Sequence, residues 1–276
     1  RNSDFRQKKF EHQSKNTAYS IKFLMHIPDG FLNNAAAMGT AMAAAGAVAV
    51  AARRVRSAFL RRVAMVRSKL VTSPSTDGGA TLQMRNELTA QGKEKIWRMA
   101  TIGAFIFSAQ MVNFPIGGGT SGHLLGGVLA ALVLGPWEAL LVISAVLGVQ
   151  AAMFGDGGIA VLGANIINMG VIGALGGYSV FHFLTKGRLT RHRFLWGAGV
   201  AAWISVVMAA VGASLELALS GTIALARVLP AMVLAHTFIG IGEGLITVAV
   251  LAFLLKRQYP LMVLEKMKEK AEYEEI

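Results

Sequence analysis

Long apolar segments, separated by short polar connections, dominate the 276-residue chain from residue 33 onward. Most of them are long enough for a helix to cross the hydrocarbon core of a bilayer, which is about 30 Å thick. The third is short for a span, which indicates a half-buried or re-entrant segment. The segments lie near residues 33–52, 97–113, 122–134, 136–154, 160–184, 195–219 and 228–256. This pattern predicts an all-α integral membrane protein with about seven transmembrane helices.

Composition supports a membrane protein and limits the residue types that could bind a metal. Hydrophobic residues make up 54% of the chain and charged residues only 15%, whereas a soluble domain is about 25% charged. The net charge of +12 comes from basic residues between the apolar segments, so it predicts membrane orientation and no nucleic-acid partner. The chain has no cysteine, so a metal site would use histidine, carboxylate or backbone groups.

The basic connections predict the orientation of the chain in the membrane. Region 53–98 contains eleven Lys/Arg and region 185–193 contains four, and Lys256 begins a third basic region. The alternate connections carry almost no charge. Since basic loops stay in the cytoplasm, we expect a multi-pass protein of the inner (plasma) membrane, with Met25 outside and the C-terminus cytoplasmic.

Charge also suggests a division of the chain. We expect residues 25–257 to form the membrane-embedded domain, with 53–96 as a cytoplasmic basic linker and 258–276 as a charged cytoplasmic tail. The first part of the linker is either a helical extension of the first span or an amphipathic helix on an anionic leaflet. Residues 1–24 are polar and basic and would oppose the orientation rule outside, so we expect a disordered extension that is not part of the functional protein.

The sequence Met25-His26 carries the strongest chemical signal. If Met25 begins the mature protein, three nitrogens can close two fused chelate rings on one ion: the α-amino nitrogen of Met25, the backbone nitrogen of His26 and the Nδ1 atom of His26. Three nitrogens in one plane suit a square-planar divalent ion such as nickel or copper. We therefore expect the active protein to begin at Met25.

A glycine-rich run at 114–123 ends in His123. It is not a phosphate loop, because no Gly-Lys-Ser/Thr follows. The run is either a tight interhelical turn or a loop that approaches a ligand, and His123 is either an interfacial histidine satisfied by its neighbours or a ligand. The predicted orientation places His123 on the same outer face as His26, where it can supply a fourth nitrogen.

Further polar residues at or inside the apolar segments have two interpretations each. Asp156 is either a ligand or a helix cap in a glycine-rich turn. Asn165 and Asn168 either donate hydrogen bonds around an ion or join helices. His236 and Glu243, seven residues apart, share a helix face, and ionisable groups inside a membrane are usually functional. His-Glu-x-x-His is absent, which argues against a zinc protease of that class.

Together these motifs resemble the CbiM/NikM family, the substrate-capture membrane components of energy-coupling-factor importers for cobalt and nickel. The resemblance covers about residues 25–257. It is carried by the segments Met25–Leu32, Gly118–Gly127, Leu134–Trp137, Phe154–Gly158, Gly163–Ile166 with Asn168–Gly170, and His236–Glu243.

The resemblance implies seven transmembrane helices and an extracytoplasmic site in which the Met25 amine, the His26 backbone nitrogen and imidazole, and the His123 imidazole bind Co²⁺ or Ni²⁺. It implies a coupling transmembrane subunit, ATP-binding cassette ATPase subunits and often a small accessory membrane subunit as partners. The chain has no ATP-binding motif, so we expect a transport subunit, not an enzyme, that supplies metal for uses such as cobalamin biosynthesis. Residues expected to hydrogen-bond around the ion or gate it are Asn113, Thr120, Ser121, Asp156, Asn165, Asn168, His236 and Glu243.

Two other functions stay open. A self-sufficient secondary cation transporter or channel would use His236 and Glu243 as its pathway. A membrane-embedded metalloenzyme would need an acid/base pair beside a metal motif, and no such pair is recognisable. Four in-plane nitrogens favour nickel or copper, but the family includes cobalt importers with the same motif, so cobalt and nickel are not distinguished.

Overall fold

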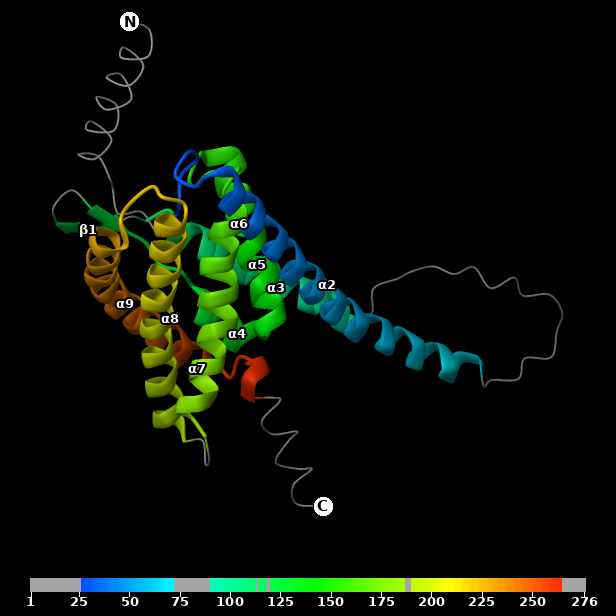
Figure 1. The fold of residues 1–276 in the computed structure, drawn as a ribbon. Helices are drawn as coiled ribbons and strands as arrows, with labels where there is room; N and C mark the ends of the chain where they lie inside the picture. Colours follow the sequence, from blue (N-terminus) through cyan, green and yellow to red (C-terminus); the bar gives the residue numbers. More distant parts are fainter. Residues whose placement is uncertain (1–25, 72–89, 113, 118–119, 187–189, 265–276) are drawn as a thin grey trace, which may run out of the picture.

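The computed structural model of the chain describes residues 26–71, 90–112, 114–117, 120–186 and 190–264. They form a bundle of helices from which α2 projects at an angle (Figure 1). The elements, with η marking π-helices, are α2 (Asn34–Val71), α3 (Ala90–Gln110), β1 (Phe114–Gly117), β2 (Thr120–Gly122), α4 (Gly127–Leu134), α5 (Pro136–Val149), η1 (Gln150–Phe154), α6 (Leu162–Asn165), η2 (Ile166–Gly176), α7 (Gly177–Leu184), α8 (Arg191–Leu219) and α9 (Leu225–Lys256).

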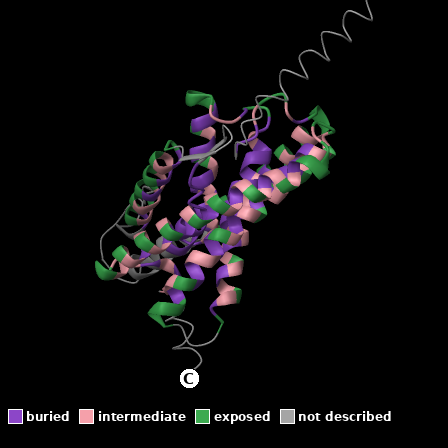
Figure 2. Ribbon diagram, turned by 90° about the vertical axis from the view of Figure 1, so that its left-hand side faces the viewer, coloured by how far each residue is buried: buried purple, intermediate pink, exposed green. Residues whose placement is uncertain are grey.

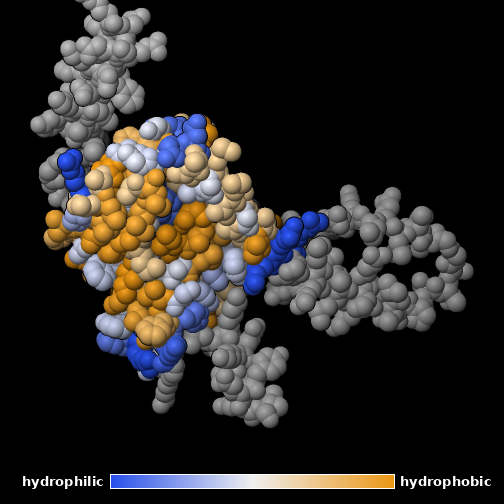
Figure 3. Space-filling view, in the orientation of Figure 1, coloured by the Kyte–Doolittle hydropathy of each residue, from blue (hydrophilic) through white to orange (hydrophobic). Residues whose placement is uncertain are grey.

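Five helical stretches among the described residues are long and apolar enough to cross a membrane. They are Asn34–Arg56, Pro136–Phe154, Leu162–Leu184, Arg191–Leu219 and Leu225–Lys256. The surface of the bundle is correspondingly hydrophobic along its flank and hydrophilic at its ends (Figure 3). The prediction of a predominantly helical fold with helices able to cross a membrane is thus confirmed.

The two remaining predicted spans have a different form. Helix α3 carries Lys93, Glu94, Lys95 and Arg98 near its start, which lowers its mean hydropathy. Helix α4 has only eight residues. The seven-helix count therefore stays a prediction.

The third apolar segment has two parts of different structure. Its first part, residues 123–126, is non-helical and buried, and α4 follows with all eight residues buried. The short hairpin β1–β2, in which Phe114 pairs with Gly122, precedes it. Of the two predicted forms, the structure supports a segment that begins as a non-helical loop, and its residues are fully rather than half buried. Figure 2 shows the buried residues gathered inside the bundle.

Helix α2 runs without a break to Val71. Of the two interpretations of the basic stretch that follows the first span, the structure supports the helical extension. Whether this stretch lies in the cytoplasm stays a prediction.

Polar contacts fasten the chain before α2 to the turn between α8 and α9. The backbone N–H of Asn33 donates to Ser220 Oγ over 2.6 Å, and the Asn33 amide donates to the Ser220 carbonyl over 3.1 Å. Thr222 Oγ1 donates to the carbonyl of Phe31 over 2.5 Å. Asn33 Oδ1 also accepts the N–H of Ala36 and so caps α2. These contacts place the segment from His26 onward at one end of the bundle.

Candidate metal-binding site

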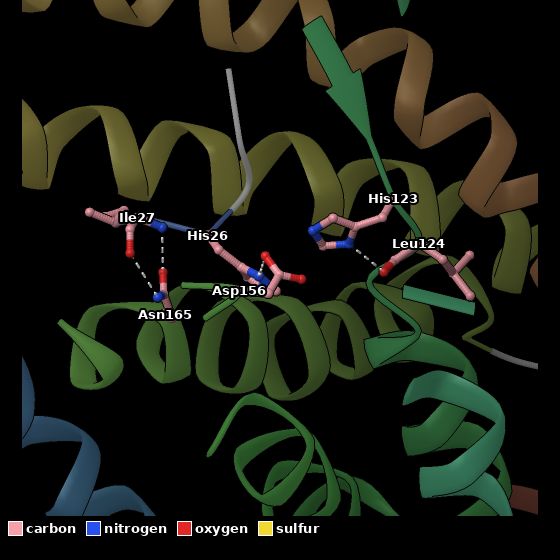
Figure 4. A network of polar contacts seen from close by, with 6 residues as sticks. All are labelled: His26, Ile27, His123, Leu124, Asp156 and Asn165. Carbon is pink, nitrogen blue, oxygen red and sulfur yellow. Dashed lines mark hydrogen bonds and ion pairs between the residues drawn. The ribbon is translucent and has the colours of Figure 1, made fainter. Parts of the chain in front are cut away.

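Asn165 holds the residue that follows His26. The N–H of Ile27 donates to Asn165 Oδ1 over 2.8 Å, and Asn165 Nδ2 donates to the carbonyl of Ile27 over 3.2 Å. The same carbonyl accepts the N–H of Gly158 at 3.1 Å. All polar groups of the Ile27 backbone are therefore bonded inside the protein, which fixes the position of His26 (Figure 4).

Asp29 gives the segment a second attachment that was not predicted. Its carboxylate accepts the N–H of Ile159 at 3.2 Å and that of Ala160 at 2.9 Å. A Cβ on Gly158 would collide with the backbone nitrogen and side chain of Asp29, so a glycine is needed there for close approach. An Asp before a glycine is a turn signal, but it does not reveal this long-range partner.

His26 is bonded through Nδ1. The ring is buried, with 2% of its surface exposed, and Nδ1 lies 3.0 Å from Asp156 Oδ1. Since a carboxylate only accepts, Nδ1 donates the proton in this contact. Nε2 is buried without a hydrogen-bond partner among the described residues. The bond from His26 holds the pKa of Asp156 below its ordinary value, so Asp156 is an anion beside the imidazole.

His123 lies next to His26. The two ring centroids are 4.7 Å apart and the rings are tilted by 47°. His123 is 4% exposed, and its Nδ1 lies 3.0 Å from the carbonyl of Leu124, which only accepts, so the lone pair is on Nε2. A neutral imidazole with its lone pair on Nε2 can bind a metal ion through that atom.

The structure brings His26, His123, Asp156 and Asn165 together (Figure 4). Asn168 instead donates to Glu216 over 2.7 Å.

Two of the predicted residues lie on α9. Glu243 binds the backbone of Leu125 and Gly126. His236 is buried, with Nδ1 at 2.7 Å from the carbonyl of Met232.

Several predicted site residues are not tested by the structure. Met25 and Asn113 lie outside the described residues, and for Thr120 and Ser121 only the backbone strand is described. Within the described part of the chain, no three His, Cys, Asp or Glu side chains form a group that could hold a metal. Further ligands, such as backbone or amino nitrogens, would be needed to complete a site around the two imidazoles.

The chain is similar to known metal transport proteins in sequence and in structure. The family model described as the cobalt uptake substrate-specific transmembrane region matches residues 78–261. A fused nickel transport protein NikMN of Rhodobacter capsulatus is 37% identical over 172 residues, 56% of this chain and 49% of the relative. A cobalt transport protein CbiM of Sorangium cellulosum is 33% identical over 165 residues, 57% of this chain and 72% of the relative.

A solved structure of a truncated transition metal transporter is 29% identical, with a TM-score of 0.66, and the match covers 84% of this chain and 99% of that one. The chain spans about half the length of the fused nickel transport proteins that it matches.

Proposed function

The chain belongs to the CbiM family, and on that basis we propose that it captures Co²⁺ or Ni²⁺ at the end of the bundle that holds His26 and His123. The observation that carries this proposal is the pair of buried imidazoles of His26 and His123, whose ring centroids lie 4.7 Å apart. Relatives with 33% and 37% identity are named as cobalt and nickel transport proteins, which supports these ions as cargo. We propose a transport role without enzymatic activity.

The proposed ligands are the α-amino nitrogen of Met25, the backbone nitrogen and Nδ1 of His26, and the Nε2 atom of His123. Nδ1 of His26 is bonded to Asp156, so the ion must replace this hydrogen bond when it binds. The Asp156 carboxylate then stays close to the ion and offsets part of its positive charge. Asn165 and Asp29 support the site by fixing the backbone on either side of Pro28.

The proposed orientation has the site outside the cell. Helix α8 begins at the basic end with Arg191 and ends beside Ser220, which bonds the segment that follows His26. Helix α9 returns to the basic end at Lys256. Since basic ends stay in the cytoplasm, the His26 end faces outward. We propose seven spans in residues 25–257, in the inner (plasma) membrane.

Release of the ion into the cell is proposed to need partners: a coupling transmembrane subunit, ATP-binding cassette ATPase subunits and a small accessory membrane subunit. The chain has no ATP-binding motif, which supports a separation of metal capture in this chain from ATP hydrolysis in partner subunits. Its relatives of the fused type are about twice as long as the matched part.

Binding of Ni²⁺ to purified protein in detergent tests the proposal. In every metal-binding measurement that compares variants, the protein begins at Met25, so that its α-amino nitrogen is free to bind the ion. We expect His26→Ala and His123→Ala to abolish stoichiometric binding, because each removes a nitrogen ligand. His192→Ala is the matched control, since His192 is exposed at the start of α8 and should leave binding unchanged. Retention of one nickel or cobalt ion per chain in either of the first two variants would refute the site.

A further inference from the structure

The chain between β2 and α4 crosses the buried interior without secondary structure. Residues 123–126 are all buried and non-helical. The carbonyl of Gly126 accepts the N–H of Ala130 in α4 over 2.9 Å, but the N–H groups of Leu125 and Gly126 need acceptors outside a helix or sheet. Inside a membrane protein such groups must be satisfied by the protein itself. The residues that satisfy them therefore decide where this stretch, and His123 at its start, can lie.

Two side chains from distant helices bind this stretch. Glu243 of α9 accepts the N–H of Leu125 with Oε2 and the N–H of Gly126 with Oε1, each over 2.8 Å. Gln110 at the end of α3 donates Nε2 to the carbonyl of Leu125, also over 2.8 Å. Both polar backbone groups of Leu125 are thus bonded by side chains. We call Gln110 and Glu243 the backbone clamp.

Close packing accompanies these hydrogen bonds. Gly126 has φ +72°, and a Cβ there would lie 2.9 Å from Ile106 of α3. The backbone therefore lies directly against α3 on one side while Glu243 of α9 binds it. A buried carboxylate is a costly residue in a membrane helix, and here both of its oxygens bind the stretch that leads from His123.

We propose that the backbone clamp positions His123 for the metal ion. It fixes the backbone two residues beyond His123 and so holds the imidazole beside His26. This inference rests on the proposed function, because it takes His123 as a ligand. Glu243 and Gln110 do not touch the ion in this scheme; they act only through the place of His123.

Glu243→Gln is the most informative variant. It keeps the size of the side chain but replaces one acceptor oxygen with an NH₂ group, which then faces a backbone N–H donor. Gln110→Glu likewise removes the donor that binds the Leu125 carbonyl. Thr247→Val is the matched control, because Thr247 is buried one turn further along α9 and its hydroxyl has no hydrogen-bond partner among the described residues.

The first measurement needs no metal. Hydrogen exchange of the Leu125 and Gly126 amides is followed by mass spectrometry on the metal-free protein in detergent. We expect exchange to be about tenfold faster or more in Glu243→Gln, since local opening becomes easier when a buried bond is lost, and unchanged in Thr247→Val. Unchanged exchange in Glu243→Gln would overturn the backbone clamp, whether or not the protein binds metal.

The second measurement is Ni²⁺ titration with absorption spectroscopy. We expect Glu243→Gln and Gln110→Glu to weaken Ni²⁺ binding about tenfold and to shift the d–d band toward longer wavelength, because the ion loses the field of one nitrogen. Faster exchange with unchanged affinity and spectrum would overturn the positioning role. Failure of the unsubstituted protein that begins at Met25 to bind Ni²⁺ would instead overturn the proposed function, while the exchange measurement would still decide whether the clamp exists.

Discussion

Asn165→Ala should weaken metal binding without any change in a ligand. The substitution removes the acceptor of the Ile27 N–H and one donor to the Ile27 carbonyl, which lie 2.8 and 3.2 Å from the amide of Asn165. Ile27 is 3% exposed, so its N–H would be left buried without a partner, which costs about 1–3 kcal/mol. If the ion binds only when this segment is seated, its dissociation constant should rise roughly 5- to 150-fold.

Isothermal titration with Ni²⁺ in detergent measures this change, and Asn168→Ala is its matched control. Asn168 is buried on the helical stretch that continues from α6, but it bonds Glu216 and not the His26 segment. We expect Asn168→Ala to lower the unfolding temperature and leave the dissociation constant unchanged. Equal affinities in Asn165→Ala and the unsubstituted protein, or equal losses in both variants, would refute the reasoning.

A further prediction concerns the same end of the bundle. Gly158→Ala should weaken Ni²⁺ binding at least tenfold, because its Cβ would displace Asp29. Gly148→Ala, where a Cβ meets nothing within 4 Å, should leave binding unchanged. Nickel titration of both variants checks this, and equal binding in the two would contradict the docking of the His26 segment against Gly158.

The course of the membrane segments could be predicted from the sequence because hydrophobic length is a local property. The predicted segment 136–154 coincides with a helical stretch in the structure. The interruption before α4 was only suggested by a short apolar run. Its cause lies in residues far apart in sequence, since Glu243 binds Leu125 across 118 positions, and no local periodicity reports such a contact.

The site was predictable to the extent that its residues are chemically unusual. The sequence predicts His26, which follows Met25, and His123, which ends a glycine-rich run, as candidate ligands. In the structure the two side chains do lie together. The supporting residues were harder to assign. Asp29 and Gln110 are common residue types in a loop and at a helix end, and only the folded chain shows that they bind Ala160 and Leu125.

The most direct measurement concerns the α-amino group of Met25. Nickel content per chain is determined by mass spectrometry for protein that begins at Met25 and for the chain as printed, in which residues 1–24 occupy that nitrogen with a peptide bond. With the amine as a ligand, we expect close to one tightly bound ion per chain in the first protein and weak binding in the second. Equal, tight binding in both would show that the free amine is unnecessary and would contradict the proposed chelate.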